Sequence, residues 1–271
     1  MIDWMGLGEY LVRAWFLLYF CKGSVVEKEK YRSTGKILFF LQSFLINCCL
    51  SYSVWVNRVL YRTENGEVMD SSYSIIKLLC VVCCSFVALD LFYQGRKLAK
   101  LYLLLVYYTV QEMSRFMLHS VWSFVMIGWI DHLCDLVMEE KIEPEYFTTV
   151  AGYLQEYSMW LYTAGYLLIM YLVLRMYRRY LTEPVEEIYR QGLWFLMLAP
   201  VIGMAFDVLW RISFYRQRGE EIEFFYEKHS SMYVIVPTIA ILCLVCTVFS
   251  RKIYSELMAS EMQKNGLMFY K

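Results

Sequence analysis

Apolar residues along this chain of 271 residues gather in long blocks that alternate with short polar segments. The blocks are roughly 17 to 25 residues long, and a helix of that length crosses about 30 Å of hydrocarbon at about 1.5 Å per residue. The pattern therefore predicts a helical chain that crosses a membrane several times. We expect seven spans, at residues 4–21, 37–56, 75–92, 101–121, 153–176, 192–210 and 233–249.

Composition supports the same class of protein. Hydrophobic residues make up 59% of the chain and charged residues 19%, and the mean hydropathy is +0.41. A soluble domain of this length has too little interior to hold so much apolar surface. We predict an all-α polytopic membrane protein with a transmembrane domain at residues 1–249 and a cytoplasmic helix at residues 250–271. No Lys or Arg run is interleaved with aromatic residues, so we expect no nucleic-acid partner.

Basic residues are divided unequally between the two sets of alternate loops. Sixteen Lys and Arg residues lie in or beside the first, third and fifth loops and the tail, whereas seven lie in the other three loops. Loops rich in Lys and Arg tend to stay in the cytoplasm. We therefore expect a multi-pass protein of the cell membrane with its N-terminus outside and its C-terminus in the cytoplasm.

The fourth loop, which this orientation places outside, is strongly acidic. Its acidic residues, set against Lys141 alone, are Asp131, Asp135, Glu139, Glu140, Glu143 and Glu145. An acidic rim favours a cationic or neutral ligand over an anionic one. The alternative interpretation is a solvated loop without a ligand, and the residues leave both open.

Ionisable residues inside the predicted spans are the candidate site. Such groups are costly in lipid and usually have a partner or a function. The candidates are Glu9, Arg13, Gln111, Glu112, Arg115, His119 and Asp207. They either fix the register of the helices or form the floor of a ligand cavity that opens outward. Pro200 and Gly203 are the candidate hinge, because proline removes a backbone donor within a helix.

No motif predicts catalysis or metal binding. The cysteines of CVVCC, beginning at Cys80, and of CLVC, beginning at Cys243, lie inside apolar spans, where small residues allow helices to approach. The three histidines are His119, His132 and His229, and they fall in unrelated segments. We expect no cofactor, no metal and no catalytic residue in this chain.

The last segment, SRKIYSELMASEMQKNGLMFYK, is polar and rich in helix formers, with apolar residues near helical period at Tyr254, Leu257, Met258 and Met262. This junction and the stretch YYTVQEMSRFMLHS resemble the membrane region of sensor histidine kinases of the GHKL class from Gram-positive bacteria, which include the agr-type peptide receptors of quorum sensing.

The resemblance implies a receptor of a two-component signal transduction system. It implies an extracellular ligand, such as a small peptide, a homodimer, and output through residues 250–271 to a cytoplasmic kinase domain that acts on a response regulator. No histidine follows His229, and the family's Asn box and glycine-rich nucleotide-binding motifs have no counterpart here. We therefore expect either a sensor module of a longer kinase or a short relative that lacks the catalytic half. A small-solute transporter or channel is the alternative, and a membrane-embedded enzyme is a third.

Overall fold

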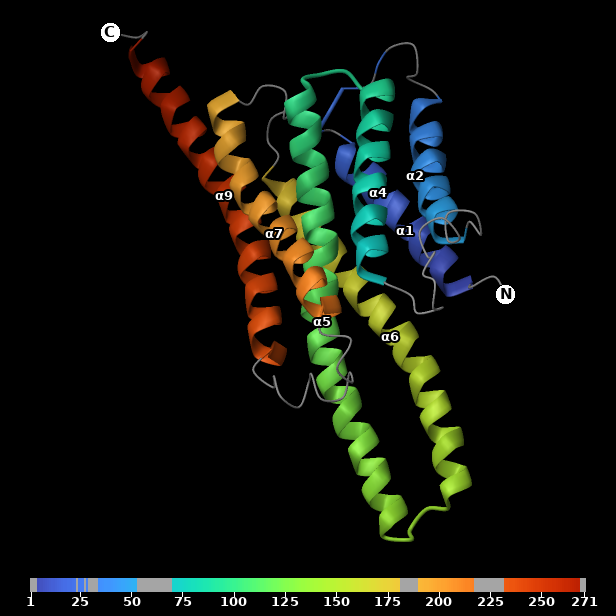
Figure 1. The fold of residues 1–271 in the computed structure, drawn as a ribbon. Coiled ribbons are helices and arrows are strands. Elements are labelled where there is room, and N and C mark those ends of the chain that lie inside the picture. Colours follow the sequence, from blue (N-terminus) through green and yellow to red (C-terminus); the bar gives the residue numbers. More distant parts are fainter. Residues whose placement is uncertain are drawn as a thin grey trace.

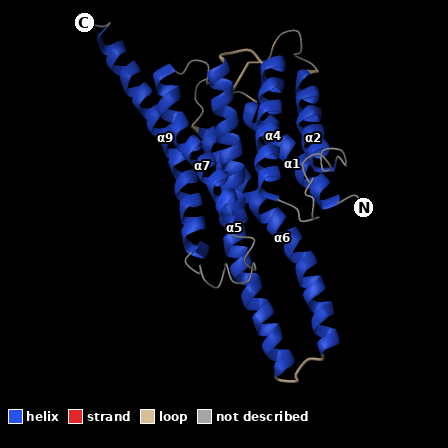
Figure 2. Cartoon of the chain, viewed as in Figure 1, coloured by secondary structure: helices blue, strands red, loops and turns tan. Residues whose placement is uncertain are grey.

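The computed structural model describes residues 4–22, 24–26, 28, 34–52, 70–180, 190–216 and 232–268. These residues form helices joined by short connections, and no strand occurs among them (Figures 1 and 2). The helices are α1 (Trp4–Cys21), α2 (Gly35–Tyr52), α4 (Asp70–Phe92), α5 (Lys97–Met138), α6 (Pro144–Arg179), α7 (Arg190–Arg216) and α9 (Met232–Met268). The predicted all-α class is confirmed.

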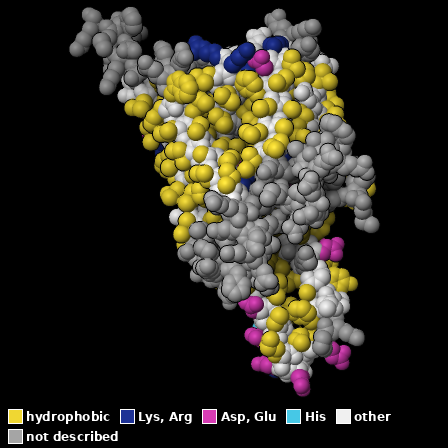
Figure 3. All heavy atoms as spheres, viewed as in Figure 1, with side chains coloured by type: hydrophobic (Ala, Val, Ile, Leu, Met, Phe, Trp, Pro, Cys, Tyr) yellow, Lys and Arg dark blue, Asp and Glu magenta, His cyan; other side chains and the backbone are white. Residues whose placement is uncertain are grey.

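Five of these helices are long and apolar enough to cross a membrane. They are α4, α5, α6, α7 and α9, while the apolar part of α2, Gly35–Leu50, is shorter. Apolar side chains cover most of the described surface of the bundle on the face that Figure 3 shows. A surface that faces lipid is expected to be apolar, because backbone polar groups there must be satisfied within helices. The chain is therefore a polytopic membrane protein, and the count of seven spans stays a prediction.

Helix α5 forms the centre of the bundle and packs against α4, α6, α7 and α9. Its residues from Tyr102 to Ser114 are almost all buried, on every face of the helix. A helix that is apolar on all sides is stable only when other helices surround it. The segment that carries Gln111 and Glu112 is thus enclosed by its neighbours.

The two ends of the molecule differ in charge. The basic end, which we define by Lys22, Arg96, Lys97, Arg178 and Lys252, lies where α1, α4 and α6 finish and α5 and α7 begin (Figure 3). Acidic side chains gather at the opposite end, where α5 turns into α6.

The predicted acidic loop between residues 121 and 153 is wrong. Helix α5 continues to Met138, and its 42 residues are about 63 Å long, twice the hydrocarbon thickness. Helix α6 already begins at Pro144, whose fixed φ suits the first helical position after the extended Glu143. Only residues 139–143 form a turn, with Glu140 at φ 54°. Residues 122–160 are the projecting hairpin (Figure 1).

Other predicted bounds shift at helix ends. Those of α1 coincide with the prediction, but α2 begins at Gly35 and α4 at Asp70; residues 53–56 of the second predicted span lie outside the described residues. Helix α7 extends past residue 210 to Arg216, so Arg211 belongs to a helix and not to an outer loop. Helix α9 runs without a break from Met232 to Met268, so the expected boundary at residues 249 and 250 falls inside one helix.

Candidate functional site

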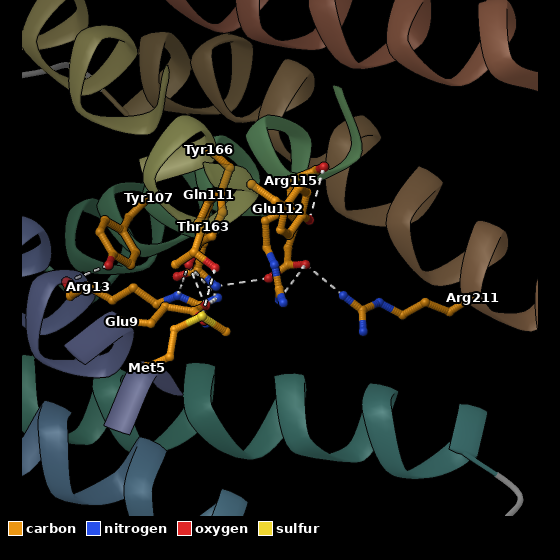
Figure 4. Close-up of polar contacts among 11 residues, drawn as sticks. Met5, Glu9, Arg13, Tyr107, Gln111, Glu112, Arg115, Thr163, Tyr166 and Arg211 are labelled. Atoms are coloured by element: carbon orange, nitrogen blue, oxygen red, sulfur yellow. Dashed lines mark hydrogen bonds and ion pairs between the residues drawn. The ribbon is translucent and has the colours of Figure 1, made fainter. Parts of the chain in front are cut away.

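A network of polar side chains crosses the middle of the bundle and joins α1, α5, α6 and α7 (Figure 4). It contains six of the seven predicted residues, namely Glu9, Arg13, Gln111, Glu112, Arg115 and Asp207. It also contains three residues that the sequence did not single out as a site, namely Tyr107, Tyr166 and Arg211.

The first half of the network ties α1 to α5 and α6. Arg13 pairs with Glu9 one turn away on α1. The hydroxyl of Tyr166 accepts hydrogen bonds from Arg13 Nε at 3.0 Å and Nη2 at 2.9 Å, and it donates one to Glu9. The hydroxyl of Tyr107 donates to the backbone carbonyl of Arg13 at 2.7 Å. Two tyrosines from different helices thus hold the charged turn of α1.

The second half joins α5 to α7 through the shared carboxylate of Glu112. Its Oε2 atom lies 2.6 Å from Arg211 Nη2 and 3.9 Å from Arg115 Nη1, and its Oε1 accepts a hydrogen bond from Gln111 at 2.9 Å. Arg211 also donates from Nε to Asp207 Oδ1 at 2.8 Å. Glu112 is almost fully buried, and several donors are what a buried carboxylate requires.

The ring of Tyr166 lies between the two halves. The guanidinium carbons of Arg13 and Arg115 lie 5.5 Å and 5.7 Å from its centroid. Both distances fall within the range of cation–π attraction. One aromatic side chain of α6 therefore contacts the cations of α1 and of α5.

Positive charge exceeds negative charge among the described residues of this region. The cations are Arg13, Arg115, Arg211 and Lys77, which lies close enough to interact electrostatically with these arginines; the carboxylates are Glu9, Glu112 and Asp207.

Arg115 has the longest ion pair in the network and a side chain that is 37% exposed. A ligand group that reaches this depth is therefore favoured when it is neutral or anionic, and Arg115 is the cation best placed to meet it.

His119 lies beside the network. It is exposed on α5, and its ring meets that of Tyr162 edge-on with centroids 5.9 Å apart. Tyr162 in turn donates a hydrogen bond to the backbone carbonyl of Arg115 at 3.5 Å. Among the described residues, His119 is therefore connected to Arg115 through the ring of Tyr162 and through an electrostatic interaction one turn away on α5.

The two candidate hinge residues both face α5. Helix α7 continues through Pro200, and Thr109 donates a hydrogen bond to the carbonyl of Pro200 at 2.9 Å. A Cβ atom at Gly203 would lie 2.6 Å from Cγ2 of the same threonine. The glycine permits a close helix contact, and a hinge motion at this point stays a prediction.

Three residues of the network were not predicted from the sequence, and of these Arg211 could have been found from its spacing. It follows Asp207 by four residues, the spacing at which charged side chains meet on one helix face. Tyr107 and Tyr166 had no such signal, because the chain holds 24 tyrosines and nothing in their spacing separates these two from the rest.

Replacing Tyr166 by Phe tests the link between the halves. The variant keeps the ring and removes the hydroxyl that bonds Arg13 and Glu9, so one buried and one partly buried charged group lose a partner. We expect the free energy of unfolding to fall by about 1 to 3 kcal/mol, measured by thermal unfolding in detergent micelles. Tyr157→Phe, at an exposed position on the same helix, is the control; equal stability of both variants would contradict the role of this hydroxyl.

Comparison with protein-family models, with curated proteins and with solved structures finds no match to this chain, so the network and the helices that hold it are the basis for a functional proposal.

Proposed function

We propose that this chain is the membrane sensor region of a two-component sensor histidine kinase. It detects an extracellular ligand and passes the signal to a cytoplasmic kinase domain that lies outside this chain. By the family resemblance the ligand is a small peptide, the receptor works as a homodimer, and the kinase acts on a response regulator. The continuity of α9 is the observation that carries the proposal.

Helix α9 is too long to end at the membrane surface. Its 37 residues rise about 56 Å, against about 30 Å of hydrocarbon. It leaves the bundle at the basic end, which the positive-inside rule assigns to the cytoplasm. The acidic turn of the projecting hairpin is then outside. A stiff helix that leaves on the cytoplasmic side suits the transmission of a displacement.

Contacts of α7 supply a route from the network to α9. Asp207 and Arg211 of α7 belong to the network. Near the basic end of the same helix, a Cβ atom at Gly192 would overlap the ring of Tyr254 on α9. The neighbouring Arg251 is 2% exposed, and its guanidinium carbon lies 5.7 Å from the ring centroid of Tyr254. Movement of α7 would therefore displace the part of α9 around Arg251 and Tyr254, from which the helix continues out of the bundle.

In energetic terms, the ligand must bind one arrangement of these helices more tightly than another, because only differential affinity shifts a conformational equilibrium. Arg115 is the group in the network that a ligand would most readily engage. Binding there would weaken its long contact with Glu112 and leave that carboxylate to Arg211 on α7.

A chimera tests the proposal. The chain is fused to the dimerisation and kinase domains of a characterised histidine kinase, and one to four alanines are inserted after Met258 in α9. Each residue rotates the following helix by about 100°, so we expect basal autophosphorylation to rise and fall with helical period. Equal autophosphorylation in all the insertion variants would show that α9 does not transmit the signal.

Transport of a small solute is the second candidate function. The buried charges favour it, because ionisable residues inside membrane spans also line the substrate paths of transporters. Vesicles that contain only this chain separate the two functions. A sensor region produces no solute uptake above that of empty vesicles, whereas uptake abolished by Glu112→Gln would support a transporter or channel.

A further inference from the structure

The outer part of the projecting hairpin exposes large apolar side chains that no described residue covers. We call residues 129–153 the acidic tip. Its exposed apolar residues include Met138 at 81%, Tyr146 at 60%, Tyr153 at 59% and Trp129. Gly128 and Gly152, at its two edges, face open space, since a Cβ atom at either would meet no atom within 4 Å. The arms of the hairpin thus lack the packing that encloses α5 within the bundle.

Lipid does not account for this surface. Measured from Lys97 at the basic end, Trp129 lies about 48 Å along α5 and Met138 about 61 Å, well beyond about 30 Å of hydrocarbon. Monomeric soluble surfaces rarely expose such groups together, and patches of this kind usually mark interaction sites.

The charge of the tip defines the partner. Residues 129–153 contain six carboxylates against Lys141, which pairs with Glu139 at 2.5 Å. Acidic side chains flank apolar ones on the face of the hairpin that Figure 3 shows. A second copy of the tip would bring like charges together, and an anionic membrane surface would also be repelled. A cationic partner with apolar side chains would be attracted by the carboxylates and could also cover the exposed apolar groups.

We propose that the acidic tip binds a cationic amphipathic polypeptide segment, which places apolar side chains against Met138 and Tyr146 and its Lys or Arg residues beside Asp131, Asp135 and Glu143. The arm from Trp129 to Met138 rises about 14 Å, the length of a segment of about ten residues in a helix. This mode resembles the docking of an amphipathic helix onto an apolar face. The proposal stands apart from the kinase proposal, because binding at the tip is measured without any output domain.

Fluorescence anisotropy with the full chain in phosphatidylcholine nanodiscs tests this. The probe is a labelled amphipathic peptide of about 14 residues of Leu, Lys and Trp, beside a scrambled peptide of the same composition and one with Glu in place of Lys. We expect the first peptide to bind the chain at least about tenfold more tightly than the scrambled one, the acidic peptide not to bind, and affinity to fall as salt rises from about 0.05 M to about 0.5 M.

Two sets of substitutions locate the surface. The combination D131N, D135N, E140Q and E143Q, and separately Met138→Ala with Tyr146→Ala, are each expected to weaken binding by about tenfold. Glu156→Gln, on the same hairpin outside the tip, is expected to change nothing. Size-exclusion profiles and helical content check that each variant folds.

Equal binding to empty nanodiscs, equal affinity for the scrambled peptide, or unchanged affinity in both sets of variants would overturn the proposal. Concentration-dependent cross-linking of two tips, with no peptide binding, would assign the surface to a second copy instead.

Discussion

Replacement of Glu112 by Ala is expected to destabilise the bundle more than any other single change in the network. The variant removes the almost fully buried carboxylate that Arg211 and Arg115 both contact, and it leaves Asp207 as the remaining ion-pair partner of the largely buried Arg211. Breaking a buried ion pair by removing one partner costs about 3 to 5 kcal/mol, because the remaining charge is uncompensated. Thermal unfolding in detergent micelles, with a spectroscopic and a size-exclusion readout, measures the loss.

Two further variants give this prediction its controls. Glu112→Gln keeps the shape of the side chain and removes its charge, so we expect a loss between those of the parent protein and Glu112→Ala. Glu156→Ala removes an exposed carboxylate from helix α6 and is expected to change stability by less than about 0.5 kcal/mol. If Glu112→Ala and Glu156→Ala unfolded at the same temperature, the arginines would not depend on Glu112.

Replacement of Gly203 by Leu is expected to be the second most damaging change. Its Cβ atom alone would lie 2.6 Å from Thr109 Cγ2 and 3.8 Å from Cys243 Cβ, so the larger side chain must separate α7 from α5 and α9. Thr109 cannot turn away without losing its hydrogen bond to Pro200. We expect the free energy of unfolding to fall by about 3 kcal/mol, which is at the upper end of the range for overpacked sites.

Gly128→Leu is the matched control, because the space around Gly128 is open. At Gly128 the same substitution is expected to change the free energy of unfolding by less than about 0.5 kcal/mol relative to the parent protein. The loss of a flexible glycine from a helix itself favours folding. Denaturant titration of both variants in the same detergent compares them. A similar loss at both positions would mean that helix propensity or exposure, and not the contact with Thr109, governs the effect.

The sequence alone predicted the class of this protein and six residues of the network. Long apolar blocks in a chain can be stable only as helices in a membrane, because every backbone polar group in lipid must be satisfied within its own segment. Charged residues inside such blocks are conspicuous because they are costly. The bounds of α1, and the selection of Glu9, Arg13 and Glu112, followed from these two facts.

The sequence did not predict the projecting hairpin, because hydropathy indicates where a chain leaves the hydrocarbon and says little about where a helix ends. Outside lipid a helix stops at a cap, and Glu143 followed by Pro144 was the local signal of a new helix start. The turn at residues 139–143, and not a change in hydropathy, separates α5 from α6.

Only the tertiary structure decided which charged groups meet. Arg211 could have paired with Asp207 alone, as their spacing on one helix suggests, but the packing of α7 on α5 also brings it to Glu112. Likewise, Tyr166 became the partner of Arg13 because α6 crosses α1 at that depth. The cost of burying each charge is a property of the residue and can be read from the chain, whereas the partner that offsets this cost depends on which helices are neighbours.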